Sequence, residues 1–227
     1  MSNLKKILVA SALALSLAGT ASAATLTING GTAGTVPGGI KNGNNALVPL
    51  GLAADAFGPY EGYYGSQIGL TTTTKAKIKF TLMGWEAAFL NTFTSGTDSF
   101  GSDGSGGKTG IWDAAGLASF VSTTLSGLLD FKFETNTGPG QTSVSNGDNQ
   151  NVAGAVNFFA SVIGDPTAKE GQSLYLFFDD DGNTLDDNHD DLVVRVDVAA
   201  VPVPAAGFML FGALGGLAAL RRRRKAV

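Results

Sequence analysis

Short apolar runs with alternating polarity are the feature of this sequence that most restricts its fold. Between residues 24 and 198 the gaps separating these runs are rich in glycine, serine, threonine and asparagine. Ile78, Phe80 and Leu82 share one face with a period of two, and the same pattern recurs from Val194 to Val198. Such alternation is typical of strands with one buried face. We therefore expect an all-β fold, an antiparallel β-sandwich of jelly-roll-like type.

Eight segments fit a strand pattern. They are Ala24 to Ile28, Ala46 to Leu52, Gln67 to Thr73, Ala76 to Met83, Gly127 to Glu134, Ala155 to Ile163, Ser173 to Asp179 and Leu192 to Val198. One segment, Trp112 to Thr124, favours a helix, although Gly116 and β-branched residues interrupt it. Residues 96–110 contain few apolar side chains, so a surface loop is expected there.

The N-terminus has the three parts of a secretory signal peptide. Lys5 and Lys6 form a basic start, an apolar stretch runs from Ile7 to Ala18, and Ala21-Ser22-Ala23 matches an A-x-A cleavage site. We expect residues 1–23 to form an N-terminal signal helix that signal peptidase removes. The rest of the chain is then exported.

An uncharged span and a basic end close the chain. Ala205 to Leu220 comprises 16 residues, so a helix here is about 24 Å long at ~1.5 Å per residue, somewhat short of the ~30 Å core of a bilayer. Lys and Arg mark the cytoplasmic side of a membrane, and five follow the span: Arg221, Arg222, Arg223, Arg224 and Lys225. We expect a C-terminal transmembrane helix over 205–220, a cytoplasmic tail over 221–227 and a domain anchored outside the inner membrane.

A proline motif precedes the span. It reads Val201-Pro202-Val203-Pro204-Ala205-Ala206. Motif, span and R-R-R-R-K end together resemble the VPLPA subgroup of PEP-CTERM sorting tails of Gram-negative bacteria, with Val203 where the subgroup has Leu. The resemblance implies an exosortase-class enzyme that cuts near the motif and delivers the domain to the cell surface or the extracellular matrix. Residues 199–204 are then a linker and sorting motif.

The exported part is acidic and has no cysteine. Residues 24–200 contain eight Lys and Arg against all 19 Asp and Glu, a net charge of −11. This charge argues against nucleic acid as a partner and is compatible with divalent cations. Without disulfides, stability must come from a packed core, and residues 24–198 are long enough for one domain.

The largest concentration of charge lies between two predicted strands. Seven aspartates fall within the 13 residues from Asp179 to Asp191, and a hard cation with oxygen ligands would relieve their repulsion. We expect calcium to bind here, with ligands Asp179, Asp181, Asn183, Asp187, Asn188 and Asp190. The spacing is not that of an EF-hand, since Gly182 is one residue after the second aspartate rather than at the turn position, and no glutamate occupies the twelfth position. A solvated acidic loop that merely makes turns is the alternative.

Aromatic side chains offer a second type of candidate site. Tyr60, Tyr63 and Tyr64 lie among glycines, and Trp85 precedes a glutamate within an aromatic-rich segment that also contains Asn91. Exposed rings of this kind stack on sugars, which would make the domain a carbohydrate-binding module. Core packing is the alternative, and the favoured one for Trp85.

Catalytic signals are scarce. Cysteine is absent, and the single histidine, His189, lies within the acidic segment, where a charge partner is expected rather than a base. Four glutamates could supply a carboxylate pair for a polysaccharide-modifying enzyme, but nothing in the sequence spaces two of them correctly. We expect a non-enzymatic surface or matrix protein, with an exopolysaccharide as a further candidate partner.

Overall fold

Two antiparallel β-sheets account for the secondary structure of the described residues, which in the computed structural model are 24–36, 60–87, 89–102, 116–136, 142–152, 154–182 and 189–201. The strands are β1 (Thr25–Val36), β2 (Tyr60–Thr71), β3 (Ala76–Gly84), β4 (Asn91–Ser95), β5 (Asp98–Gly101), β6 (Ala118–Thr124), β7 (Gly127–Leu128), β8 (Lys132–Thr135), β9 (Ser143–Ser145), β10 (Asn157–Val162), β11 (Glu170–Gly171), β12 (Ser173–Asp179) and β13 (Leu192–Ala200). No helix occurs among these residues.

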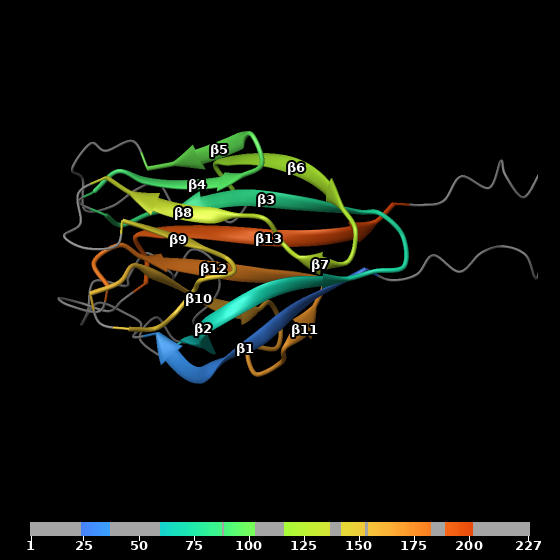
Figure 1. Ribbon diagram of the computed structural model, residues 1–227, viewed down its shortest axis with the longest axis horizontal. Helices are drawn as coiled ribbons and strands as arrows, with labels where there is room; N and C mark the ends of the chain where they lie inside the picture. The colour runs from blue at the N-terminus through green and yellow to red at the C-terminus, as the bar shows by residue number, and fades with distance from the viewer. Residues whose placement is uncertain are drawn as a thin grey trace, which may run out of the picture. The chain divides into compact units, whose positions relative to one another are not determined.

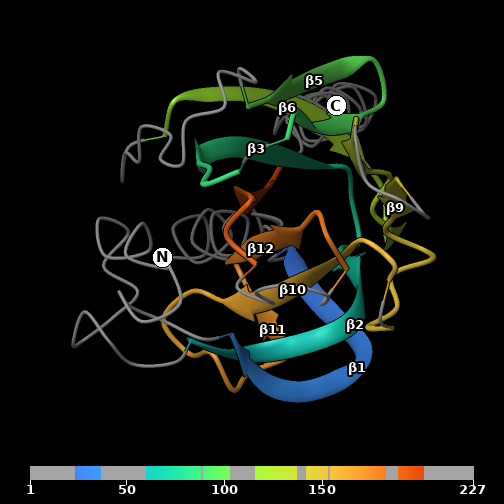
Figure 2. The ribbon, with the colours of Figure 1, turned by 90° about the vertical axis from the view of Figure 1, so that its left-hand side faces the viewer.

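The two sheets differ in size. The large sheet has nine strands in the order β11-β1-β2-β10-β12-β13-β3-β6, with β7 paired to β2, and the small sheet has the order β5-β4-β8-β9. Figure 2 shows the large sheet running from β6 and β3 through β12 and β10 to β2 and β1. All pairings are antiparallel, which confirms the predicted fold class at this level.

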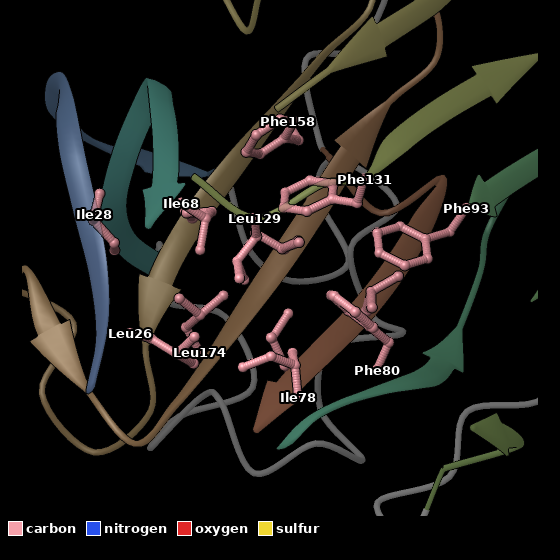
Figure 3. Close-up of a cluster of buried hydrophobic side chains, with 14 of the residues drawn as sticks. Leu26, Ile28, Ile68, Ile78, Phe80, Phe93, Leu129, Phe131, Phe158 and Leu174 are labelled. Carbon is pink, nitrogen blue, oxygen red and sulfur yellow. The ribbon is translucent and has the colours of Figure 1, made fainter. Parts of the chain in front are cut away.

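A phenylalanine-rich core fills the space between the sheets. Phe80 on β3 and Phe158 on β10 project from the large sheet, and Phe93 projects from the small one (Figure 3). Phe133 of β8 belongs to the same cluster. The Phe133 ring stacks on Phe178 of β12 with centroids 4.8 Å apart. Burying each ring contributes about 1.5–3 kcal/mol relative to exposure, so this layer holds the sheets together without disulfides.

A second buried cluster lies on the opposite face of the large sheet. Its members are Val36, Met83, Phe159, Tyr175, Phe177 and Val193. Successive residues of a strand point to opposite faces, so two covered faces explain why every residue of β10 is buried. A strand buried on both sides lacks the alternation that marks a half-exposed one.

Two asparagine side chains bond backbone groups that would otherwise need a neighbouring strand. The Asn146 amide accepts from the N–H of Ile68 at 2.7 Å and donates to the carbonyls of Ile68 and Leu129 at 2.8 and 2.7 Å. Asn149 likewise accepts from the N–H of Phe158 and donates to the carbonyl of Phe158, and it also donates to the carbonyl of Ser66. Both side chains are buried. Asn149 satisfies backbone groups where β2 and β10 no longer pair directly, and Asn146 does so beside the short pairing of β2 with β7, as buried polar groups require.

The structure corrects two predictions about local structure. Within the segment expected to be helical, Ala118–Thr124 forms strand β6, because its Phe, Val and Thr side chains suit pairing with β3. Part of the expected loop over 96–110 forms β5, which pairs with β4 across a turn at Gly96. Gly96 has φ +61°, the left-handed conformation that this turn needs.

Both ends of the domain lie close together. Gln172 donates from Nε2 to the carbonyl of Ala24 at 2.6 Å, and its own carbonyl accepts from the N–H of Val198 at 2.9 Å. The beginning of β1 and the end of β13 are therefore neighbours, as Figure 1 shows. Asp191 immediately precedes β13, at the other end of that strand.

Several predictions fall on undescribed residues. They are the signal helix over 1–23, the strand over 46–52, most of the sorting motif, the transmembrane helix over 205–220 and the basic tail. The described residues include no helix that could span a bilayer by its length and apolarity.

Candidate functional site

Five aspartates gather where β12 ends and β13 begins. Asp179 is the last residue of β12, Asp180 and Asp181 follow it, and Asp190 and Asp191 lead into β13. We call these five the acidic cluster. Asp179, Asp180 and Asp190 are 1%, 4% and 0% exposed. Carboxylates are seldom buried this completely unless they are paired or bind a metal.

The backbone around the first aspartate forms a tight turn. Asp179 Oδ1 accepts from the N–H groups of Asp181 and Gly182, at 3.0 and 3.1 Å. Gly182 has φ +72°, and a Cβ at this position would lie 2.6 Å from the nitrogen of Ala155. Only glycine fits such a conformation at such close approach. The turn therefore directs the chain away from β12 while one oxygen of Asp179 holds the backbone.

Asp180 connects the acidic cluster to the small sheet. Its N–H donates to Asp191 Oδ2 at 2.8 Å, and its Oδ2 accepts from Asn91 Nδ2 at 2.6 Å. Asn91 is the first residue of β4 and is fully buried. The same Nδ2 lies 3.4 Å from the carbonyl oxygen of Asp191. One amide group thus contacts both sides of the β12–β13 connection.

The electrostatic environment disfavours ionisation of two cluster members. Burial raises the pKa of Asp180 to about 6, an effect that the Asn91 hydrogen bond opposes and the charges of Asp179 and Asp181 reinforce. Burial of its carboxyl group likewise raises the pKa of Asp191 well above the usual range, and the neighbouring Asp180 raises it further. The described charges that shift these two pKa values are all carboxylates. Protonation or a bound cation is needed to relieve them.

The predicted calcium ligands are only partly described. The structure places Asp179, Asp181 and Asp190 together in the acidic cluster, whereas Asn183, Asp187 and Asn188 lie outside the described residues. Asp180 and Asp191 belong to the cluster but were not among the predicted ligands. The described part of the chain contains no group of three or more His, Cys, Asp or Glu side chains arranged to hold a metal ion.

The single histidine packs among aromatic rings. His189 is fully buried with φ +57°, and its Nε2 lies 2.8 Å from Asn157 Oδ1. Its ring contacts Tyr64 edge-on, with centroids 5.2 Å apart. Although His189 directly precedes Asp190, its ring belongs to a layer with Phe159 on the second face of the large sheet.

The candidate sugar-binding aromatics do not form one platform. Tyr63 joins the main core, and its hydroxyl donates to the carbonyl of Thr167. Tyr64 lies on the opposite face of β2, and its hydroxyl donates to the carbonyl of Thr35. Trp85 packs against the main core, as core packing predicts, and the side chain of Tyr60 lies outside the described residues.

Sequence reasoning assigned Asn91 to the aromatic segment and did not connect it with the acidic cluster. The signal available was a polar residue within an apolar stretch, which indicates a buried, hydrogen-bonded group but not its partner. That partner, Asp180, is 89 positions away. Comparison with known proteins identified no family model, curated protein or solved structure that matches the chain.

Proposed function

We propose that this chain is an exported bacterial surface or matrix protein whose β-sandwich binds calcium at the acidic cluster and has a non-catalytic binding or structural role. The observation that carries the proposal is the pair Asp180 and Asp191, whose carboxyls are enclosed at the base of one hairpin. Calcium accepts six to eight oxygen ligands in flexible geometry. A bound ion would allow both carboxylates to remain charged.

The remaining ligands would come from both ends of the same connection. Asp179, Asp181 and Asp190 flank the pair, and the predicted ligands Asn183, Asp187 and Asn188 follow in the segment between them. Two antiparallel sheets with a shared core support the sandwich. The jelly-roll-like connectivity and the two flanking helices stay predictions.

Thermal unfolding of the full chain tests calcium binding. An ion that binds only the folded state stabilises it by RT ln(1 + [L]/Kd), about 2.7 kcal/mol at a hundredfold excess over Kd. For a domain of this size we expect the Tm to rise by roughly 5–10 °C between EDTA and calcium. Magnesium should give a smaller shift, because it demands octahedral geometry and dehydrates reluctantly. Equal Tm values in EDTA and calcium would contradict the proposal.

The terminal signals support an exported location. The route we propose begins with signal peptidase, continues with anchoring at the inner membrane and ends with an exosortase-class enzyme. Mass spectrometry of the protein from its own host should find Ala24 as the first residue and a new C-terminus within or beside residues 201–206. Exchanging Pro202 and Pro204 for alanine should block the C-terminal cut, whereas Val203→Leu should preserve it. An intact Lys225 in the mature protein would overturn the sorting proposal.

A carbohydrate-binding role receives less support. Tyr63 and Tyr64 point to opposite faces of β2, and both hydroxyls are hydrogen-bonded to backbone carbonyls. Stacking on a sugar needs rings that share an exposed surface. The acidic cluster is therefore the better-supported functional site.

A further inference from the structure

Four strands lie at the ends of the two sheets, and three of them are short. β11 has two residues, β9 has three and β5 has four, whereas β6 has seven, Ala118–Thr124. β6 ends the large sheet beside β3 (Figure 2) and pairs with it in continuous register, without a bulge. β6 is therefore the one long edge strand in the described part of the chain.

The outer edge of β6 lacks the protection that edge strands normally have. Such strands are usually shortened, bulged or supplied with charges or proline, because their free N–H and C=O groups can pair with another chain. No charged residue and no proline occurs from Leu117 to Leu129. Among the described residues, the backbone of β6 is hydrogen-bonded to β3 alone. The other half of its backbone groups is available to a further strand.

Exposed apolar side chains are spaced symmetrically along this edge. Val121 is the middle residue of β6, and Leu117 and Leu125 lie four residues to either side of it. All three are exposed. In an antiparallel pair of two β6 strands about a two-fold axis through Val121, this valine faces its own counterpart, and Leu117 faces Leu125 of the partner subunit. A slip of one residue would remove this match, because it exchanges the two faces of the strand.

We propose that two copies of this chain associate through β6, so that their large sheets join into one continuous sheet with the order β3-β6-β6-β3 at the junction. The occupant of the edge is a second copy because the edge is complementary to itself under two-fold symmetry. This association is independent of the calcium binding proposed above, and it gives the exported domain a partner of its own kind.

The charges nearest to the edge permit this contact. Lys79 of β3 pairs with Val121, so two copies of Lys79 would lie three strand spacings apart, about 14 Å at ~4.8 Å per spacing. Charges are largely screened beyond ~8 Å at physiological ionic strength. The junction itself is uncharged, which removes the like-charge repulsion that normally keeps edge strands apart.

The contact is narrow, so the dimer should be weak. A strand of seven residues is about 24 Å long at ~3.4 Å per residue. A single pair of such strands belongs to the class of small interfaces, below ~1,200 Å² in total. Association should therefore depend steeply on the concentration of the chain, and attachment of many copies to one surface would favour it.

Cysteine cross-linking of the full chain tests both the association and its register. The chain has no cysteine of its own, so one introduced thiol reports one position. Opposed residues of antiparallel strands have Cα atoms about 4.5–5.5 Å apart, which suits a disulfide. Under a mild oxidant Val121→Cys should form at least about ten times more covalent dimer than Thr123→Cys, whose two copies would lie about 14 Å apart.

Sedimentation equilibrium of the full chain measures the association without a cross-link. Val121→Lys gives the edge the charge that protected edge strands carry and should weaken the dimer at least about tenfold. Val152→Lys is the matched control, because Val152 is 49% exposed against 53% for Val121 and lies between β9 and β10. It should associate like the wild type. Both positions are exposed, so both variants should keep the wild-type Tm when dilute.

The outcomes are distinct from those of the calcium experiment. Cross-linking that favours Val121, together with loss of the dimer in Val121→Lys alone, supports the proposal. A wild type that stays monomeric up to its solubility limit would overturn it. Equal cross-linking at Val121 and Thr123, or equal association of the two lysine variants, would also overturn it, because association would then proceed through another part of the chain.

Discussion

Replacing Asp180 with asparagine should make the calcium-free protein more stable at neutral pH. The substitution is nearly isosteric and removes a charge from a residue that is 4% exposed. Asn91 Nδ2 can donate to the new amide oxygen as it does to the carboxylate. The variant should therefore lose calcium binding and gain stability, a combination that a purely structural aspartate would not give.

The magnitude follows from the pKa of Asp180. Its ordinary value is 3.8 and burial raises it to about 6 in the folded chain, a shift worth about 3 kcal/mol at 1.36 kcal/mol per pKa unit. Because the folded state binds the proton more tightly than the unfolded state, this group destabilises the protein as the pH rises from about 4 through 6. The raised pKa of Asp191 has the same sign, so this carboxyl also lowers the stability of the folded protein as the pH rises.

Urea unfolding in EDTA at several pH values measures the effect. The free energy of unfolding of Asp180→Asn should equal that of the wild type near pH 3 and exceed it by about 3 kcal/mol at pH 7. Asp98→Asn, at the exposed first residue of β5, controls for net charge. In saturating calcium the order should reverse. A difference that is the same at pH 3 and pH 7 would refute the argument from buried charge.

Two further substitutions test the packing. Asn146→Ala leaves the N–H of Ile68 and the carbonyl of Leu129 without their asparagine partner, so urea unfolding should show a loss of about 3 kcal/mol of stability. Gln67→Ala removes an exposed hydrogen bond to Gly147 and should cost less than about 1 kcal/mol. Equal losses in the two variants would contradict the argument. Gly62→Ala places a Cβ 2.4 Å from the carbonyl oxygen of Ala160 and should lower stability by about 1–3 kcal/mol, whereas Gly147→Ala meets only an ordinary contact at 3.6 Å and should be nearly neutral.

The sequence predicts β12 with its observed bounds and β3 to within one residue, the first from a continuous apolar run and the second from alternation. Along β3, Ile78 and Phe80 are buried while Lys77 and Lys79 are exposed, so the period of two was visible. Strand β6 was mistaken for a helix because it lies at the edge of the sheet, where its polar and apolar residues are about equally exposed. Pairing with β3 makes this segment a strand, and the sequence of the segment itself carries no signal of that pairing.

Of the candidate site, the sequence predicted only the concentration of negative charge. The run of aspartates from Asp179 to Asp191 locates the hairpin, because so many adjacent carboxylates need a turn and a means of charge relief. Which of them are buried depends on packing against another sheet. Asn91 reaches Asp180 through the position of β4, and a contact across such a separation leaves no trace in the spacing of either segment.

The closeness of Ala24 and Val198 gives the domain two distinct poles. Strand β13 covers nine residues, about 30 Å at ~3.3 Å per residue, and the acidic cluster lies at its far end. About the length of one strand, some 30 Å, therefore separates the acidic cluster from the end of the domain where Ala24 and Val198 lie together, so a change at the cluster can reach those two ends only along the strands of the large sheet.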